Sequence, residues 1–345
     1  MTADNSTHLR VLAVDGGGVR GIIPVRVLVA LEEMTGRRAA DLFDILVGTS
    51  IGGIGILALM RPDPEGAPMW TARDLLVEYS TRAAEIFPHT SLSWPQSMQQ
   101  LSEMIRRPSP TAALLGSNPR LGNARYDPAG LIDILTGQLG GAMLSEALRR
   151  TIVTSYDVRS QQPVLFDSVK VKSGDQEDVP MITAARATSA APTFFPPMVD
   201  MDAAGEERLL VDGGIFANNP ALLGYQAARE SGAAPSDVAL VSLGTGLHGP
   251  NTSLNRAEYM GSSWFRLAQS LMQSAQVGNV AVIDSFLKTI IGDHYWRFDA
   301  PLTGPINHDM DNTTVEHVKW LDTAGKAMVG ERIADLKQLA DVLVR

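Results

Sequence analysis

A serine stands at the centre of the sequence G-T-S-I-G at residues 48–52, directly after the apolar run 45–47. This G-x-S-x-G pattern is typical of a nucleophile elbow, a sharp turn between a strand and a helix that projects a serine hydroxyl beyond the sheet. Gly48 and Gly52 flank the serine because a Cβ at either position would collide with the opposing backbone. The pattern predicts that Ser50 is a nucleophile at a helix N-terminus, where negative charge is favoured.

A glycine-rich loop, D-G-G-G-V-R-G, comes earlier at residues 15–21. It lies between an apolar run and a helical pattern, so its backbone N–H groups would favour an anion. Three of its glycines also fit the dinucleotide-binding pattern G-x-G-x-x-G. That pattern requires an acidic residue at the end of the second strand, which here ends on Gly48-Thr49-Ser50. We therefore favour an oxyanion hole formed by Gly16, Gly17 and Gly18; a tight turn without a ligand is the other interpretation.

A serine nucleophile needs a general base, and two kinds of residue are candidates. No histidine directly follows the turn at the end of a predicted strand, and no acid-then-histidine order of an α/β-hydrolase is evident after the serine. Asp212 ends a predicted strand and precedes two glycines, a geometry that aims a short carboxylate at the elbow of a neighbouring strand. We expect Asp15, the competitor, to accept hydrogen bonds from loop amides, because a carboxylate beside an oxyanion site would oppose the developing charge. The histidines are His8, His89, His248, His294, His308 and His317.

Apolar patterning predicts alternating strands and helices around these residues. Short apolar runs predict strands at 9–14, 45–49, 151–157, 163–167, 208–211 and 238–243. Apolar residues at helical spacing predict helices at 22–31, 51–60, 71–87, 127–139, 182–187, 218–228 and 263–291, and two more within 313–344. A rigid apolar turn at 190–197 is interpreted as structural.

The composition limits the class of protein. The 345 residues are 45% hydrophobic and 19% charged, as in a packed globular protein. The sequence contains no run of about 18 apolar residues, so it predicts no membrane-spanning helix. The N-terminus lacks the features of a signal peptide, and the sequence therefore predicts a cytoplasmic protein. The net charge of −9 argues against a nucleic-acid polymer as partner. The absence of cysteine excludes disulfides, thiolate metal sites and a cysteine nucleophile.

We expect one domain over residues 1–345. Residues 88–125 contain several prolines and little periodicity, which predicts an irregular cap or insertion. It is interpreted either as a lid that covers a pocket or touches lipid, or as a segment that packs on its own domain. Residues 262–345 predict a mainly helical C-terminal part.

These motifs, in this order, resemble those of the patatin-like phospholipases. The likeness covers nearly the whole chain. It rests on residues 15–21, 48–52, 186–197, 212–214 and 240–246, and on a closing Met310-Asp311 segment that we expect to be helical.

The resemblance implies a three-layer α/β/α fold with a central mixed, mostly parallel sheet and a nucleophile elbow. It also implies a Ser-Asp dyad without histidine, in which Ser50 is the nucleophile, Asp212 is the base, and Gly16, Gly17 and Gly18 form the oxyanion loop. The activity implied is that of a lipid acyl hydrolase of phospholipase A type, which cleaves fatty-acyl esters of glycerophospholipids during peripheral contact with a membrane. No metal or cofactor is expected.

Three functional contexts stay open. The first is a lipolytic hydrolase that acts whenever it meets a membrane. The second is a regulated effector, since bacterial proteins that resemble this family include phospholipases activated by cyclic nucleotides in antiphage defence. The third is a catalytically silent lipid-binding or storage protein of the same fold. A homo-oligomer is compatible with each of them.

Overall fold

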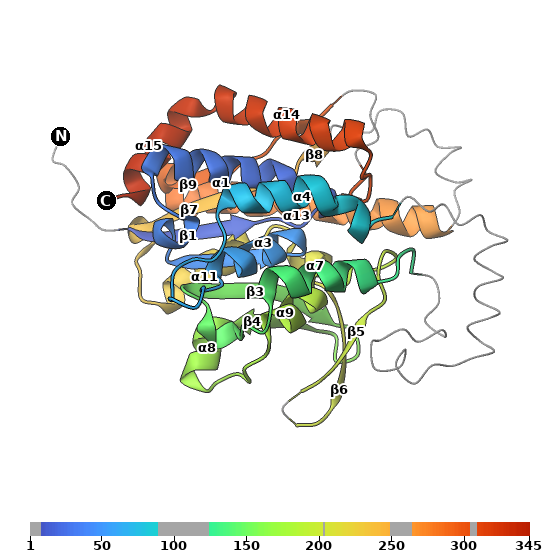
Figure 1. Cartoon of the computed structure of the whole chain (residues 1–345). Helices are drawn as coiled ribbons and strands as arrows, with labels where there is room; N and C mark the ends of the chain where they lie inside the picture. Colours follow the sequence, from blue (N-terminus) through green and yellow to red (C-terminus); the bar gives the residue numbers. More distant parts are fainter. Residues whose placement is uncertain (1–7, 89–123, 203, 249–263, 304–308) are drawn as a thin grey trace, which may run out of the picture.

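Eight strands form one sheet at the centre of the molecule (Figure 1). The computed structural model describes residues 8–88, 124–202, 204–248, 264–303 and 309–345. The strand order is β5-β6-β3-β2-β1-β7-β9, with β4 paired to β3. The strands are β1 (Leu9–Val14), β2 (Ile45–Thr49), β3 (Arg150–Asp157), β4 (Gln162–Asp167), β5 (Met198–Met201), β6 (Glu207–Asp212), β7 (Val238–Leu243) and β9 (Tyr295–Phe298).

The sheet is mixed and mostly parallel, as the family resemblance implies. β1, β2, β3, β7 and β9 run parallel to one another, whereas β4 and β6 run antiparallel to β3. β5 and β6 form an antiparallel hairpin at one edge. A separate pair of short strands is formed by β8 (Leu247–His248) and β10 (Pro301–Leu302).

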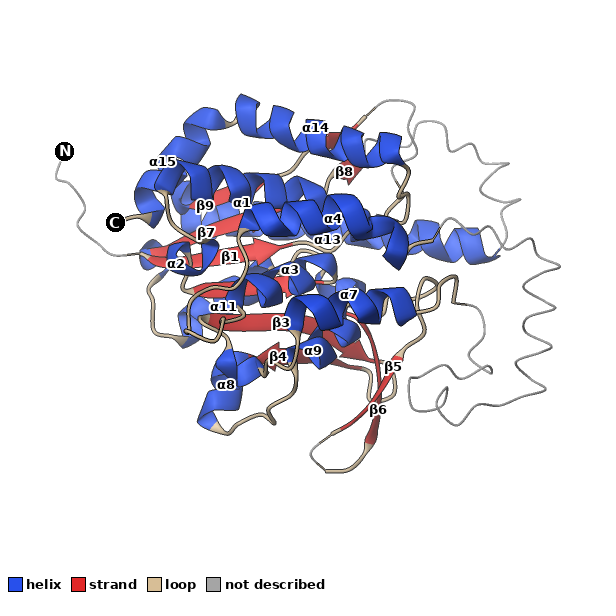
Figure 2. Ribbon diagram, viewed as in Figure 1, coloured by secondary structure: helices blue, strands red, loops and turns tan. Residues whose placement is uncertain are grey.

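Helices cover both faces of the sheet (Figure 2). The longer ones are α1 (Ile22–Thr35), α3 (Ile51–Met60), α4 (Ala72–Ile86), α7 (Ala129–Leu139), α9 (Met181–Thr188), α11 (Ala221–Glu230), α13 (Trp264–Ile291), α14 (Val315–Glu331) and α15 (Ile333–Leu343). Short helices α2 (Ala39–Leu42), α8 (Ser168–Ser173) and α10 (Gly214–Ala217) connect them. Of the helices in the described residues, none combines the length and apolar composition needed to cross a bilayer.

The two faces of the sheet have separate buried clusters, which follows from the alternation of side chains along a strand. Leu12 and Val14 of β1 pack in the cluster that includes α1, α3, α4, α7 and α9. Val11 and Ala13 pack in the cluster that includes α11 and α13. The three-layer α/β/α architecture is therefore confirmed.

Local chemistry fixes the start of α4, which lines the site described below. Thr71 precedes the helix, and its hydroxyl accepts a hydrogen bond from the Asp74 N–H at 2.9 Å. Asp74 Oδ2 in turn accepts from the Thr71 N–H at 2.9 Å. This reciprocal capping box satisfies two N–H groups that a helix start would otherwise leave unpaired.

The structure differs from the sequence predictions at a few elements. Met310 and Asp311 lie in a turn before α14, so the prediction that this segment is helical is wrong; α14 starts only after the N-cap residue Thr314. Strands β5 and β9 were not predicted, because four residues give too short a run to show a period. The predicted cap at 88–125 lies almost wholly outside the described residues.

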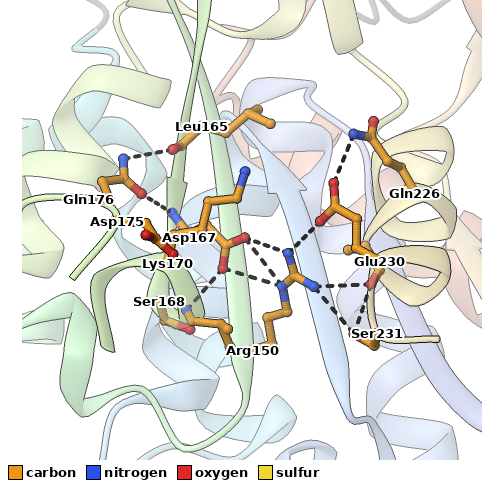
Figure 3. Close-up of polar contacts among 12 residues, drawn as sticks. Arg150, Leu165, Asp167, Ser168, Lys170, Asp175, Gln176, Gln226, Glu230 and Ser231 are labelled. Carbon is orange, nitrogen blue, oxygen red and sulfur yellow. Dashed lines mark hydrogen bonds and ion pairs between the residues drawn. The ribbon is translucent and has the colours of Figure 1, made fainter. Parts of the chain in front are cut away.

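A charged network holds the sheet at the N-terminal end of β3, the end away from the predicted elbow (Figure 3). The Arg150 guanidinium donates to Asp167 Oδ2 at 2.7 Å and to Glu230 Oε2 at 2.9 Å. It also donates to the Ala227 carbonyl at 3.0 Å. Asp167 is almost fully buried, so Arg150 neutralises its charge while joining β3 and β4 to the end of α11.

Candidate active site

Ser50 lies between β2 and α3, at the position that the sequence predicts for an elbow. Its backbone angles are φ 55° and ψ −126°, and positive φ is uncommon for a residue with a Cβ. Its N–H donates to the Thr188 hydroxyl at 2.8 Å, which holds the turn. The Ser50 side chain makes no capping hydrogen bond to α3, so its hydroxyl is left to other partners.

Gly48 and Gly52 leave room for this turn. A Cβ on Gly48 would lie 2.6 Å from the Gly52 carbonyl oxygen, and a Cβ on Gly52 would lie 2.3 Å from the Val14 carbonyl oxygen. Gly16 is less tightly enclosed: a Cβ there would lie 2.8 Å from Asn218 Oδ1 and 3.2 Å from the Ser50 Cβ. Glycine at these positions therefore lets the elbow pack against the end of β1, where the glycine-rich loop begins.

Asp212 reaches Ser50 from the end of an antiparallel strand. The prediction that it lies on a strand next to the elbow is wrong, because β3 separates β6 from β2. Thr154 of β3 pairs with Thr49, the last residue of β2, and Ser155 pairs with Asp212. Asp212 is therefore level with the elbow, and Ser50 and Asp212 line one cavity, where the Ser50 hydroxyl lowers the pKa of the Asp212 carboxyl group.

The Asp212 carboxyl group is buried, with 5% of the residue exposed. Its Oδ1 accepts a hydrogen bond from the Gly214 N–H at 2.7 Å. Burial raises the pKa of Asp212 to about 6, against the hydrogen bonds from Ser50 and Gly214, which lower it. A carboxylate with this pKa is ionised at neutral pH and is also basic enough to accept a proton.

The three glycines of the loop differ in their hydrogen bonds. The Gly16 N–H, one of the three predicted oxyanion donors, donates to the Asn218 carbonyl at 3.1 Å and is therefore already engaged in this conformation. The N–H groups of Gly17 and Gly18 have no hydrogen-bond acceptor within the described part of the chain. The Thr245 hydroxyl donates to the Gly16 carbonyl at 2.6 Å and fixes the loop from the end of β7.

Asp15 is paired with an arginine. Arg297 of β9 donates from Nη1 to Asp15 Oδ1 at 3.0 Å and from Nη2 to Asp15 Oδ2 at 2.7 Å. The same Nη2 donates to Asp299 Oδ2 at 2.5 Å. Burial raises the pKa of Asp15 to about 6 although Arg297 opposes that shift. Asp15 therefore has a structural partner, but the prediction of loop amides as its partners is wrong.

Two cavities open at Ser50. One is lined by Ser50 and Asp212 together with Gly17. The other is apolar and lies between α4 and α7, over Ile54 of α3. Among the described residues that line either cavity, none is a histidine. The described part of the chain holds no cluster of three or more acidic or histidine side chains that could bind a metal ion.

Sequence reasoning missed several residues of this site. Thr188 and Arg297 lie far from Ser50 along the chain. Thr188 belongs to the segment 186–197 that carries the family resemblance, but no role at the site was assigned to either residue. The apolar turn at 190–197, interpreted as structural, supplies Ala191 and Phe194 to both cavities. The run of aromatic and proline residues in that turn was the signal available, and its composition alone does not say which side chains face a substrate.

Comparisons with known proteins show the family to which the chain belongs. The family model described as "Patatin-like phospholipase" matches residues 12–224. Patatin-like protein 2 of Arabidopsis thaliana is 31% identical over 357 residues, covering 94% of this chain and 83% of the relative. Patatin-like protein 1 of the same plant is 35% identical over 231 residues, covering 64% of this chain and 51% of the relative. The chain belongs to the patatin-like phospholipase family, and this membership supports a lipid acyl hydrolase activity.

A search of solved structures also gave a match. The crystal structure of VipD from Legionella pneumophila aligns with 97% of this chain and 67% of its own, at a TM-score of 0.45 and 13% sequence identity.

Proposed function

We propose that the protein hydrolyses fatty-acyl esters of glycerophospholipids, as a phospholipase A, through a dyad of Ser50 and Asp212. The observation that carries this proposal is that Ser50 and the buried Asp212 line one cavity together with Gly17 of the glycine-rich loop. Acyl transfer requires a nucleophile, a base within reach and donors for the oxyanion. The N–H groups of Gly17 and Gly18 are the candidate donors, which narrows the loop of three glycines to two.

In the acylation step, Asp212 accepts the proton of the Ser50 hydroxyl while the Ser50 oxygen attacks the ester carbonyl carbon. The carbonyl π electrons move to oxygen, and the resulting oxyanion accepts hydrogen bonds from Gly17 and Gly18. When this intermediate collapses, the bond to the alcohol breaks. The lysolipid leaves with the proton that Asp212 held, and the acyl group stays on Ser50.

Hydrolysis of the acyl-enzyme repeats these events with water. Asp212, again ionised, accepts a proton from a water molecule whose oxygen attacks the acyl carbonyl carbon. The same two amides hold the second oxyanion. Its collapse breaks the bond to Ser50, the proton returns from Asp212 to the serine oxygen, and the fatty acid leaves. The cycle regenerates both residues and uses one water molecule for each ester.

The apolar cavity supports a lipid acyl chain as the substrate group. It begins at Ser50 and is lined by Ile54, Leu135 and Phe194, which would remove a hydrocarbon chain from water. A chain in this cavity would have its ester carbonyl beside the serine oxygen. We propose that the protein extracts this chain during peripheral contact with a membrane.

The test is ester hydrolysis by matched serine variants. Ser50→Ala should abolish release of fatty acid from phosphatidylcholine vesicles and abolish labelling by a fluorophosphonate. Ser236→Ala, at an exposed serine, is the matched control and should retain both. Circular dichroism checks that each variant is folded. Turnover by a folded Ser50→Ala variant would contradict the proposal, and absence of labelling in the wild type would favour the lipid-binding or storage alternative.

The regulatory and structural parts of the proposal have their own tests. A cytosolic phospholipase activated by cyclic nucleotides should release more fatty acid when a panel of cyclic dinucleotides is added, and equal rates would remove that context.

We also propose that residues 1–345 form one domain, because a single sheet takes strands from β1 to β9 and α14 packs against α1. One cooperative unfolding transition is the expected result.

A further inference from the structure

One face of α7 forms a wall of the apolar cavity. Leu131, Ile134, Leu135 and Gln138 all line it, and their spacing of three and four residues places them on the same side of the helix. Three of the four are aliphatic. The fourth residue on this side of the helix, Gln138, carries an amide group, which a pocket for a plain hydrocarbon chain would not need.

The Gln138 side chain is buried and lacks a partner for its oxygen. Only 1% of the residue is exposed, and Oε1 has no hydrogen-bond partner among the described residues. The backbone carbonyl of Gln138 is separately engaged by Arg61 Nη1 at 2.6 Å and by Trp70 Nε1 at 3.1 Å. A buried acceptor without a partner costs about 1–3 kcal/mol, so it requires an explanation.

Apart from the proposed nucleophile Ser50, the other polar side chains that line this cavity have partners in the described structure. The Tyr79 hydroxyl donates to the Ile51 carbonyl at 3.1 Å. The Ser189 hydroxyl donates to the Ala185 carbonyl at 2.7 Å. Arg82 and Glu78 form an ion pair at 3.4 Å. The Gln138 oxygen therefore differs from its neighbours in having its hydrogen-bonding capacity unused.

Ser50 and Gln138 lie beside opposite ends of α3. Ser50 precedes the N-terminus of α3, whereas Arg61, which binds the Gln138 carbonyl, follows its C-terminus. The ten residues of α3 span about 15 Å. An acyl chain whose carbonyl is at Ser50 would run beside α3 and reach the Gln138 amide in its middle or distal part.

We infer that the cavity selects acyl chains that carry a hydroxyl group, which donates a hydrogen bond to Gln138 Oε1. This inference rests on the proposed function and defines its substrate class as esters of hydroxylated fatty acids. A hydroxyl supplies the donor that the amide oxygen lacks, whereas a methylene leaves the oxygen unpaired and a ketone supplies only another acceptor. One such hydrogen bond corresponds to about a tenfold preference in kcat/KM.

The test uses p-nitrophenyl octadecanoates that carry one hydroxyl group at successive carbons along the chain, with the unsubstituted ester as reference. The wild type should show a maximum at one region of the chain, about tenfold above the reference in kcat/KM. Gln138→Leu should flatten this profile, because leucine has a similar size and no acceptor. Gln226→Leu, the same change at an exposed glutamine of α11 that lines neither cavity, is the matched control and should keep the maximum. If Gln138→Leu does not fold, Gln138→Met replaces it.

Each outcome bears on the inference. A flat profile in the wild type, or a maximum that persists in Gln138→Leu, overturns it while leaving the proposed hydrolase in place. A keto ester that is cleaved as well as the best hydroxy ester shows that Oε1 is not the recognising atom and also overturns it. Failure to cleave any ester of the series would overturn the proposed function itself.

Discussion

The substitution Asp212→Asn should remove activity and, at neutral pH, increase stability. Burial raises the pKa of Asp212 from its ordinary value of 3.8 to about 6. The native state therefore holds this proton more tightly than the unfolded chain, and ionisation of Asp212 costs folding free energy as the pH rises through this range. At 1.36 kcal/mol for each pKa unit, the penalty at pH 7 is about 3 kcal/mol. An uncharged asparagine avoids it.

The assay is urea unfolding of both proteins between pH 4 and pH 8. The free energy of unfolding of Asp212→Asn minus that of the wild type should rise by about 2.4 kcal/mol from pH 4 to pH 8, because about 0.5 kcal/mol of the penalty is already present at pH 4. Taking this difference cancels the contribution of other groups, including Asp15, whose pKa is raised in the same direction. A difference that does not change with pH, or that falls as the pH rises, would refute the reasoning.

Asp157→Asn is the matched control. It is the same chemical change, but the pKa of Asp157 is lowered whereas that of Asp212 is raised, so the expected effect on stability has the opposite sign. Burial alone would raise the pKa of Asp157, but hydrogen bonds from Ser160 and from the N–H groups of Leu209 and Arg159 outweigh it and lower the pKa below 3.8. Its carboxylate therefore stabilises the fold above that pH, and the stabilisation is lost as the pH falls. Asp157→Asn should be less stable than the wild type at pH 7, and the deficit should shrink in acid.

Three further predictions concern the elbow, the charged network and the pH dependence of turnover. Gly52→Ala should unfold or inactivate the protein, measured by circular dichroism and esterase rate, since its Cβ would lie 2.3 Å from a backbone oxygen. Arg150→Met should lower the free energy of unfolding in urea by about 3–5 kcal/mol because it strands buried Asp167, whereas Arg159→Ala, at an exposed ion pair, should cost under about 1 kcal/mol. The kcat/KM should fall about tenfold per pH unit below about 6, as protonation removes the base Asp212; a level profile down to pH 4 would exclude this residue as the base.

The strands that carry the site could be predicted because their patterns are local. The apolar runs before the glycine loop and before Ser50 correspond to β1 and β2, and the residues after Ser50 form α3 as predicted. The glycine requirement at Gly48 and Gly52 also follows from the turn type alone. Motif and pattern agree here because each depends on neighbours within a few residues.

The pairings across the sheet could not be predicted from such patterns. The position of β3 between β2 and β6 depends on which strands pair, and no local property of Asp212 contains that information. The same holds for Asp15, since its partner Arg297 is 282 residues away on a strand too short to be recognised. The engagement of the Gly16 N–H by Asn218 likewise arises only when distant segments meet.

Because β6 pairs with β3, the side of the sheet on which the proposed base Asp212 lies depends on whether an odd or an even number of residues separates it from the rest of β6. Because side chains of a strand alternate between faces, one residue inserted between Arg208 and Asp212 would turn the carboxylate to the far side of the sheet, while leaving the chain hydrophobic enough to fold. Two inserted residues would restore the face but displace the carboxylate by about 6.8 Å. Natural variation in length should therefore be confined to the tip of the β5–β6 hairpin. Residues added there change neither the face of the sheet on which Asp212 lies nor the residue of β3 with which it pairs.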